Sequence, residues 1–184
     1  ELYPSSGETI SIAAFYKHFD SPIEWTYTVS GGTDLVYSYK NALSADNIGL
    51  EMDLRKNLAF IGLDNFSVSF NGVLIHSKVH FEEGSREEDR PMQGQSPYLV
   101  NGGIFYNSSR LGLDIALLYN RIGKRIIGVG RTEGSIGGED QARVPDSYEM
   151  PRNSLDLTFS KKFGEHFDLK LYFRNLLGEG ITYK

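Results

Sequence analysis

The sequence predicts an all-β fold, an antiparallel up-and-down meander of long strands. Two observations support this prediction: apolar and polar residues alternate with a period of two, and short and long connections alternate between the segments that show it. The alternation is clear at 154–173, where Leu155 and Leu157 alternate with polar residues and Phe167 resumes the pattern after a short turn. Because successive side chains of a strand point to opposite faces of a sheet, this stretch predicts a hairpin with one apolar and one polar face.

The first three expected strands differ in how clearly they alternate. A strand at 9–19 follows the turn signal PSSG, and a strand at 46–56 has the cleanest alternation in the chain, in NIGLEMDLRK. The third strand, 66–81, changes phase near its middle. Asn71 and Gly72 lie at that point, so we expect a β-bulge there.

The last four expected strands form two hairpins. Strands at 97–106 and 111–122 flank a tight turn at 107–110, and strands at 153–163 and 167–177 flank a turn at 164–166. The predicted apolar parity of the alternating strands is expected to form one face: Ile48, Leu50, Met52, Leu54, Leu113, Ile115, Leu117, Leu155, Leu157, Leu169 and Leu171.

Connection length sorts by position along the chain. The connections at 4–8, 57–65, 107–110 and 164–166 are short, whereas 20–46, 82–96 and 123–152 are long. In a meander, alternate connections lie at the same end of the sheet, so all the short turns share one end. Short turns at one end, long loops at the other and strands of about 10 residues are typical of a transmembrane outer-membrane β-barrel.

Composition excludes several other classes. The 184 residues contain no apolar run of the roughly 20 residues that a membrane helix needs. The formal net charge of −5 argues against nucleic acid as a partner, and the absence of cysteine excludes thiolate metal sites and cysteine nucleophiles. The turn signal after three residues leads us to expect a fragment of a longer protein, with 1–184 as a single segment of a barrel.

Several segments resemble the late barrel strands of TonB-dependent outer-membrane receptors, most closely the Bacteroidetes type. The most specific is PDSYEMPRNSLDLTFSKKFGEHFDLKLYFRNLLGEGITY, with MPRN entering a strand, KKFG at the turn and NLL closing the next strand. AAFYKHFDSPIE and ALLYNRIGKRIIGVG are similar to earlier strands of these barrels. The resemblance implies the C-terminal part of the barrel, without the plug domain and the final strands.

The resemblance also implies a function for the parent protein. Such receptors import a scarce nutrient, such as an iron–siderophore, cobalamin or a glycan, across the bacterial outer membrane with energy delivered through TonB. The implied partners are TonB, the plug domain, outer-membrane lipid and a small nutrient ligand. Two alternatives stay open: a passive outer-membrane pore or adhesin barrel, and a soluble β-domain that binds a partner.

The candidate site residues fall into two groups. Residues of the long loops are the first candidates for ligand contact: Trp25, Tyr37, Tyr39, Arg86 and Arg90. Charged residues on the polar parity of their strands are expected to face the lumen: Glu51, Asp53, Arg55 and Asp156.

Other patterns have simpler interpretations. His76 and His80 are about 13 Å apart along one strand and cannot chelate one ion together. The acidic run at 82–89 lacks the spacing of a calcium loop, and the glycines at 128–134 lack that of a dinucleotide loop. No serine lies in a catalytic motif, so we expect neither an enzyme, nor a metal, nor a cofactor.

Overall fold

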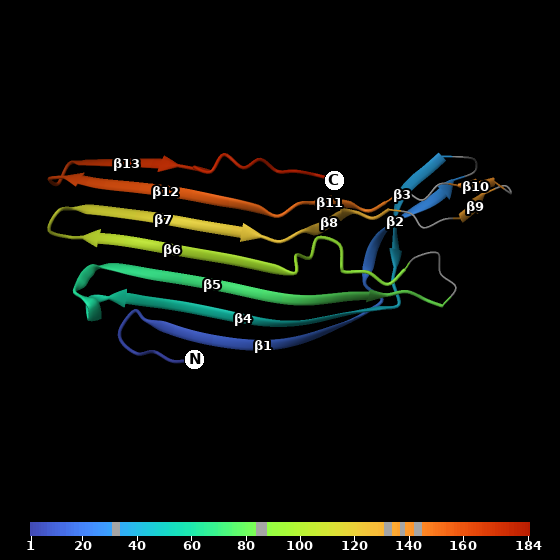
Figure 1. Cartoon of the computed structure of the whole chain (residues 1–184), viewed down its shortest axis with the longest axis horizontal. Helices are drawn as coiled ribbons and strands as arrows, with labels where there is room; N and C mark the ends of the chain where they lie inside the picture. The colour runs from blue at the N-terminus through green and yellow to red at the C-terminus, as the bar shows by residue number, and fades with distance from the viewer. Residues whose placement is uncertain (31–33, 84–87, 131–133, 137–138, 142–144) are drawn as a thin grey trace.

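A computed structural model of the chain describes residues 1–30, 34–83, 88–130, 134–136, 139–141 and 145–184. At 26–30, 34–37, 134–136 and 139–141 the description covers the backbone alone. Its main feature is a seven-stranded antiparallel sheet in which strand order follows chain order (Figure 1). The predicted all-β meander is therefore confirmed. Its strands are β1 (Thr9–Asp20), β4 (Ser44–Leu58), β5 (Leu63–His80), β6 (Tyr98–Ser108), β7 (Leu113–Ile122), β12 (Arg152–Phe163) and β13 (Phe167–Phe173).

The short turns all lie at one end of this sheet and the long connections at the other, as expected (Figure 1). Each short turn contains a glycine with positive φ, a conformation that is energetically unfavourable for a residue with a Cβ. These glycines are Gly7, Gly62, Gly112 and Gly164. The turn after β4 also contains η1 (Ala59–Ile61), a single 3₁₀ turn.

Two of the long connections contain hairpins, which the sequence did not predict. β2 (Ile23–Ser30) pairs with β3 (Asp34–Asn41), and β8 (Arg125–Gly128) pairs with β11 (Ser147–Glu149). Beyond β8, β9 (Gly134–Ile136) pairs with β10 (Glu139–Gln141). The sequence of β2, IEWTYTVS, does alternate with a period of two, but the segment falls within the long connection expected at 20–46. β8 and β11 have four and three residues, which is too short for the alternation to identify a strand.

The strand register gives the sheet one apolar and one polar face. The apolar face carries all eleven residues predicted to share it, together with Ile10, Ile12, Val68, Phe70, Ile104 and Phe159. The polar face carries Ser11, Asn47, Glu51, Asp53, Arg55, Ser69, Asn71, Asn101, Asn120, Ser154, Asp156 and Lys170.

The predicted bulge at Asn71 and Gly72 is wrong. Both residues pair in unbroken register with β4 and with β6, and the irregularity lies instead at Asn57 and Leu58. The phase of the pattern changes because the apolar residues near the start of β5 lie on the apolar face, whereas the last apolar residues of the strand lie on the polar face. Val79 is one of the latter, and it is fully buried in a small core with Ala42 and Ala45, against Phe81 and Met92.

The last strand is shorter than predicted and ends at Phe173 rather than at residue 177. Asn175 has a φ of 52°, and its backbone N–H donates to the Asp156 carboxylate at 2.8 Å instead of to a β12 carbonyl. The chain then returns to the neighbouring strands, and Tyr148 and Lys184 exchange two backbone hydrogen bonds. The Asp156 carboxylate thus interrupts the ladder at Asn175, and the Leu176 N–H again donates to a β12 carbonyl, that of Leu155, at 2.8 Å.

Gly49 is expected to be intolerant of a side chain. A Cβ there would lie 2.4 Å from the Phe15 ring and 2.8 Å from the Leu74 carbonyl oxygen. We expect Gly49→Ala to lower the free energy of unfolding by about 1–3 kcal/mol, because a backbone atom cannot move aside as a flexible side chain does. Gly102→Ala is the control, since nothing lies within 4 Å of its Cβ position. Equal losses for the two variants in denaturant titrations would contradict this packing.

Candidate functional site

A row of side-chain amides crosses the polar face of the sheet. The Nδ2 of Asn120 donates to Oδ1 of Asn101 at 2.7 Å, and Asn101 donates to Asn71 at 3.2 Å. Asn71 in turn donates to the Asp53 carboxylate at 3.0 Å. The four residues lie on neighbouring strands from β7 to β4, each directly opposite the next. They form a continuous hydrogen-bonded ribbon, called here the amide row.

The amide row extends by register to both sides of these four strands. Ser11 of β1 lies opposite Asp53, and Ser154 of β12 lies opposite Asn120. The Ser154 hydroxyl donates to Asp156 at 3.2 Å. Six strands therefore present hydroxyl, amide and carboxylate groups at one level of the polar face. The hydroxyl and amide groups can both donate and accept hydrogen bonds, and the carboxylate accepts them, which suits contact with a polar ligand or a peptide backbone.

The four charged residues expected on the polar parity all lie on the polar face. Glu51, Asp53 and Arg55 are exposed on β4, and Asp53 ends the amide row. Asp156 is half-buried and is engaged by the Asn175 backbone. Sequence reasoning identified these charges but missed the amide row. The feature of the sequence that could have predicted the amide row is the presence of three asparagines in strand interiors, where asparagine is normally rare.

The long-hairpin end carries an exposed aromatic pair. Trp25 on β2 and Tyr39 on β3 lie opposite each other, with ring centroids 4.2 Å apart. Their exposed fractions are 38% and 61%, and the ring planes are inclined by 42°, so together they present an exposed apolar surface with polar tips. The Tyr37 side chain and the whole of Arg86, two other expected ligand contacts, lie outside the described residues.

Arg90 is placed differently from the exposed contact that the sequence suggested. Its guanidinium is buried and donates through Nη1 to the buried Glu24 carboxylate of β2 at 2.7 Å. The same group lies over the Phe81 ring, 5.2 Å from its centroid. Within the described part of the chain, Nε and Nη2 of Arg90 find no hydrogen-bond partner. Arg90 therefore ties the β2–β3 hairpin to the segment 88–96.

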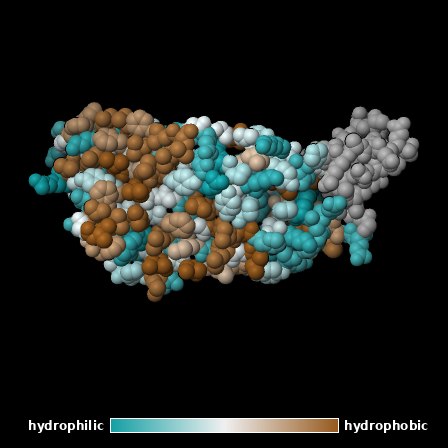
Figure 2. Space-filling view, in the orientation of Figure 1, coloured by the Kyte–Doolittle hydropathy of each residue, from teal (hydrophilic) through white to brown (hydrophobic). Residues whose placement is uncertain are grey.

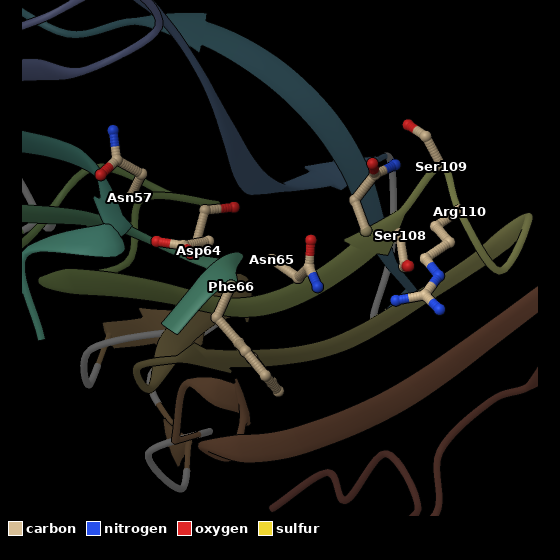
Figure 3. Close-up of a pocket in the computed structure, with 9 residues that line it drawn as sticks. Asn57, Asp64, Asn65, Phe66, Ser108, Ser109 and Arg110 are labelled. Carbon is tan, nitrogen blue, oxygen red and sulfur yellow. The ribbon is translucent and has the colours of Figure 1, made fainter. Parts of the chain in front are cut away.

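A polar hollow of about 500 Å³ lies at the opposite end of the sheet, between the turns that follow β4 and β6 (Figure 3). None of the residues expected to contact ligand lines it. No histidine is among its lining residues, and Asp64 is its one carboxylate. The hollow is lined by Asn57, Asp64, Asn65, Phe66, Ser67, Asn107, Ser108, Ser109 and Arg110.

Three further observations bear on the class of protein. Among the described residues, no group of three or more His, Asp or Glu side chains is placed to hold a metal ion. The described part of the chain also contains no helix long and apolar enough to cross a membrane. Comparison with protein-family models, with curated proteins and with solved structures gave no match.

The Glu24–Arg90 pair gives a direct test of how the hairpin is held. We expect Arg90→Ala to cost about 3–5 kcal/mol locally, because it leaves a buried carboxylate without its partner. The Val79 N–H donates to the Arg90 carbonyl at 2.8 Å, so hydrogen exchange at Val79 should accelerate by about two orders of magnitude or more.

The double variant Glu24→Gln, Arg90→Met is the control for this test. It removes both charges while keeping side chains of similar size, and it should restore most of the protection at Val79. Unchanged exchange in Arg90→Ala would show that the ion pair does not hold this segment.

Proposed function

We propose that the chain is part of a transmembrane β-barrel of the bacterial outer membrane, with its apolar face on lipid and its polar face on the lumen. The observation that carries this proposal is the exposure of the apolar face. Ile12, Ile48 and Leu74 are 64%, 58% and 59% exposed. Just five apolar side chains of the described residues are buried, and all are small or medium-sized. A soluble sheet would cover such a face with a second layer.

The distribution of apolar residues supports the same proposal. Figure 2 shows apolar residues gathered over the half of the sheet nearer the short turns, with polar residues toward the long hairpins. A membrane-spanning sheet is expected to have an apolar band that gives way to polar surface where its strands leave the bilayer.

Aromatic residues flank the apolar face at both ends, as in the girdles of membrane barrels. Tyr16, Tyr98 and Tyr119 lie toward the long hairpins. Toward the short turns lie two contacting pairs, Phe66 with Tyr106 and Phe163 with Phe167. Tyr98 and Tyr106 lie on one strand, about 27 Å apart at roughly 3.4 Å per residue. A strand tilt of about 40° reduces this to about 21 Å along the membrane normal, somewhat less than the roughly 25 Å apolar band of outer-membrane barrels.

We further propose that the parent protein is a TonB-dependent receptor for a scarce nutrient such as an iron–siderophore, cobalamin or a glycan. The sequence resemblance and the sorting of long hairpins to one end support this assignment. In this account the aromatic pair Trp25 and Tyr39 meets the nutrient at the outer surface. Arg90 contributes indirectly, because it fixes the hairpin that carries the pair.

The polar face then serves passage rather than chemistry. The amide row offers hydrogen bonds to a nutrient or to a plug domain inside the lumen. Energy for import comes from the inner membrane through TonB, so the barrel itself needs binding groups and a polar path. A catalytic constellation is not required for this function.

Uptake in whole cells tests the proposed function. The full receptor is expressed in cells supplied in turn with a radiolabelled ferric siderophore, cobalamin and an oligosaccharide. We expect uptake of one of them to require TonB and to fall at least tenfold in Trp25→Ala, Tyr39→Ala. Glu165→Gln, in the exposed short turn at the other end of the sheet, is the comparison variant and should retain uptake. Equal uptake in cells with and without TonB would refute energised import and favour a passive pore.

A further inference from the structure

A chain of alternating acidic and basic side chains lies beyond Tyr16, at the long-hairpin end of the apolar face. It runs across three strands and ends on the segment 88–96. In spatial order its members are Asp20, His18, Asp46, His80, Asp89 and Lys78.

Each histidine ring lies between two carboxylates, one at each ring nitrogen. His18 has Nδ1 2.7 Å from Asp46 and Nε2 3.2 Å from Asp20. His80 has Nδ1 2.9 Å from Asp89 and Nε2 3.5 Å from Asp46. A neutral imidazole carries one N–H, so it can satisfy one of its two carboxylates, whereas an imidazolium donates from both nitrogens. The geometry therefore fits two protonated histidines.

From this geometry we propose that the six side chains form a pH-dependent latch that holds the segment 88–96 against the ends of β1, β4 and β5. With both rings protonated, three positive groups face three carboxylates and the latch is neutral. With both rings neutral, Lys78 alone faces three carboxylates, and Asp46 and Asp89 repel each other. The latch is therefore closed while both rings are charged, at acidic pH, and opens when they lose their protons as the pH rises.

The other charged and titratable groups around the latch do not reverse this pH dependence. Tyr16 donates its hydroxyl to Asp46 at 2.5 Å, and Glu82 and Glu88 flank the segment with further negative charge. Lys78 donates to Asp89 at 3.1 Å. That bond, together with those from the Phe81 amide and His80, holds the pKa of Asp89 below its usual range. Asp89 thus stays ionised above that lowered pKa, and its contribution is lost when the pH falls through it.

The latch extends the proposed function by adding regulation to the same hairpin end. Asp89 directly precedes Arg90, which holds Glu24 of the β2–β3 hairpin. Release of Asp89 therefore loosens the segment that supports the aromatic pair. The inference rests on the proposed function for its biological role alone, because the latch itself is a property of the folded chain.

Spin labelling of the parent barrel, purified in detergent micelles, tests the latch without any substrate. These 184 residues contain no cysteine, so Glu88→Cys, in a parent barrel whose other cysteines are replaced by serine, gives a single labelling site beside Asp89. We expect the label to be immobilised at pH 5.5 and to gain a mobile component at pH 8.5, because histidine is the side chain whose charge ordinarily changes between these values. The double variant His18→Asn, His80→Asn should make the label mobile at both pH values. The single variant Asp89→Asn should do the same.

His76→Asn is the matched control, because this histidine lies on the same strand and face but takes no part in the latch. It should leave the pH response unchanged. A label with the same mobility at both pH values in the otherwise unaltered chain would overturn the latch. So would a full pH response in the variant lacking both latch histidines. Neither result depends on TonB or on lipid. The uptake experiment can therefore refute the proposed function without refuting the latch, and the spin-label experiment can refute the latch without refuting the proposed function.

Discussion

The constant register of the seven-stranded sheet is the constraint on which the rest of the structure depends. Each strand pair continues the parity of the pair before it, so apolar residues from β1 to β13 reach one face. A slip of one residue in a single pair would exchange the two faces of every strand beyond it. The positive-φ glycines of the short turns keep those turns tight. The one irregularity in the β4–β5 register, at Asn57 and Leu58, lies beside a turn, so the rest of that strand pair keeps its faces.

The same register creates features that no single strand contains. The amide row exists because Asn71, Asn101 and Asn120 fall on the same level and the same face of three neighbouring strands. The latch forms in the same way on the other face, since His18 and His80 both reach Asp46 from opposite sides. In both sets, polar groups that would be unfavourable singly become partners of one another.

The sequence predicted the main strands well because their pattern is local. Leu50, Met52 and Leu54 alternate within one segment, and nothing outside that segment is needed to recognise them. Features that depend on distant residues were missed. The phase change in β5 suggested a bulge, because the buried place of Val79 against Ala42 and Ala45 could not be known from the strand alone.

The same reasoning explains the outcome for the candidate site. The separation of His76 and His80 along one strand was sufficient to reject a shared metal ion, but it concealed the partners that His80 finds on β4 and at Asp89. Arg90 was selected for its charge, whereas its position is set by Glu24, 66 residues earlier in the chain. Charge and residue type alone do not distinguish an exposed ligand contact from a buried structural ion pair.

Fluorescence quenching by lipid tests most directly whether the apolar face contacts a membrane. Trp25 is the single tryptophan of these 184 residues, so a parent barrel in which Trp25 and every tryptophan outside this segment are replaced by Phe accepts one new tryptophan at a chosen site. Leu117 and Leu118 are neighbours on β7 that face opposite sides of the sheet. With the parent barrel in vesicles of brominated lipid, Leu117→Trp should be strongly quenched and Leu118→Trp should not. Equal quenching at the two positions, or stronger quenching at Leu118, would contradict the account.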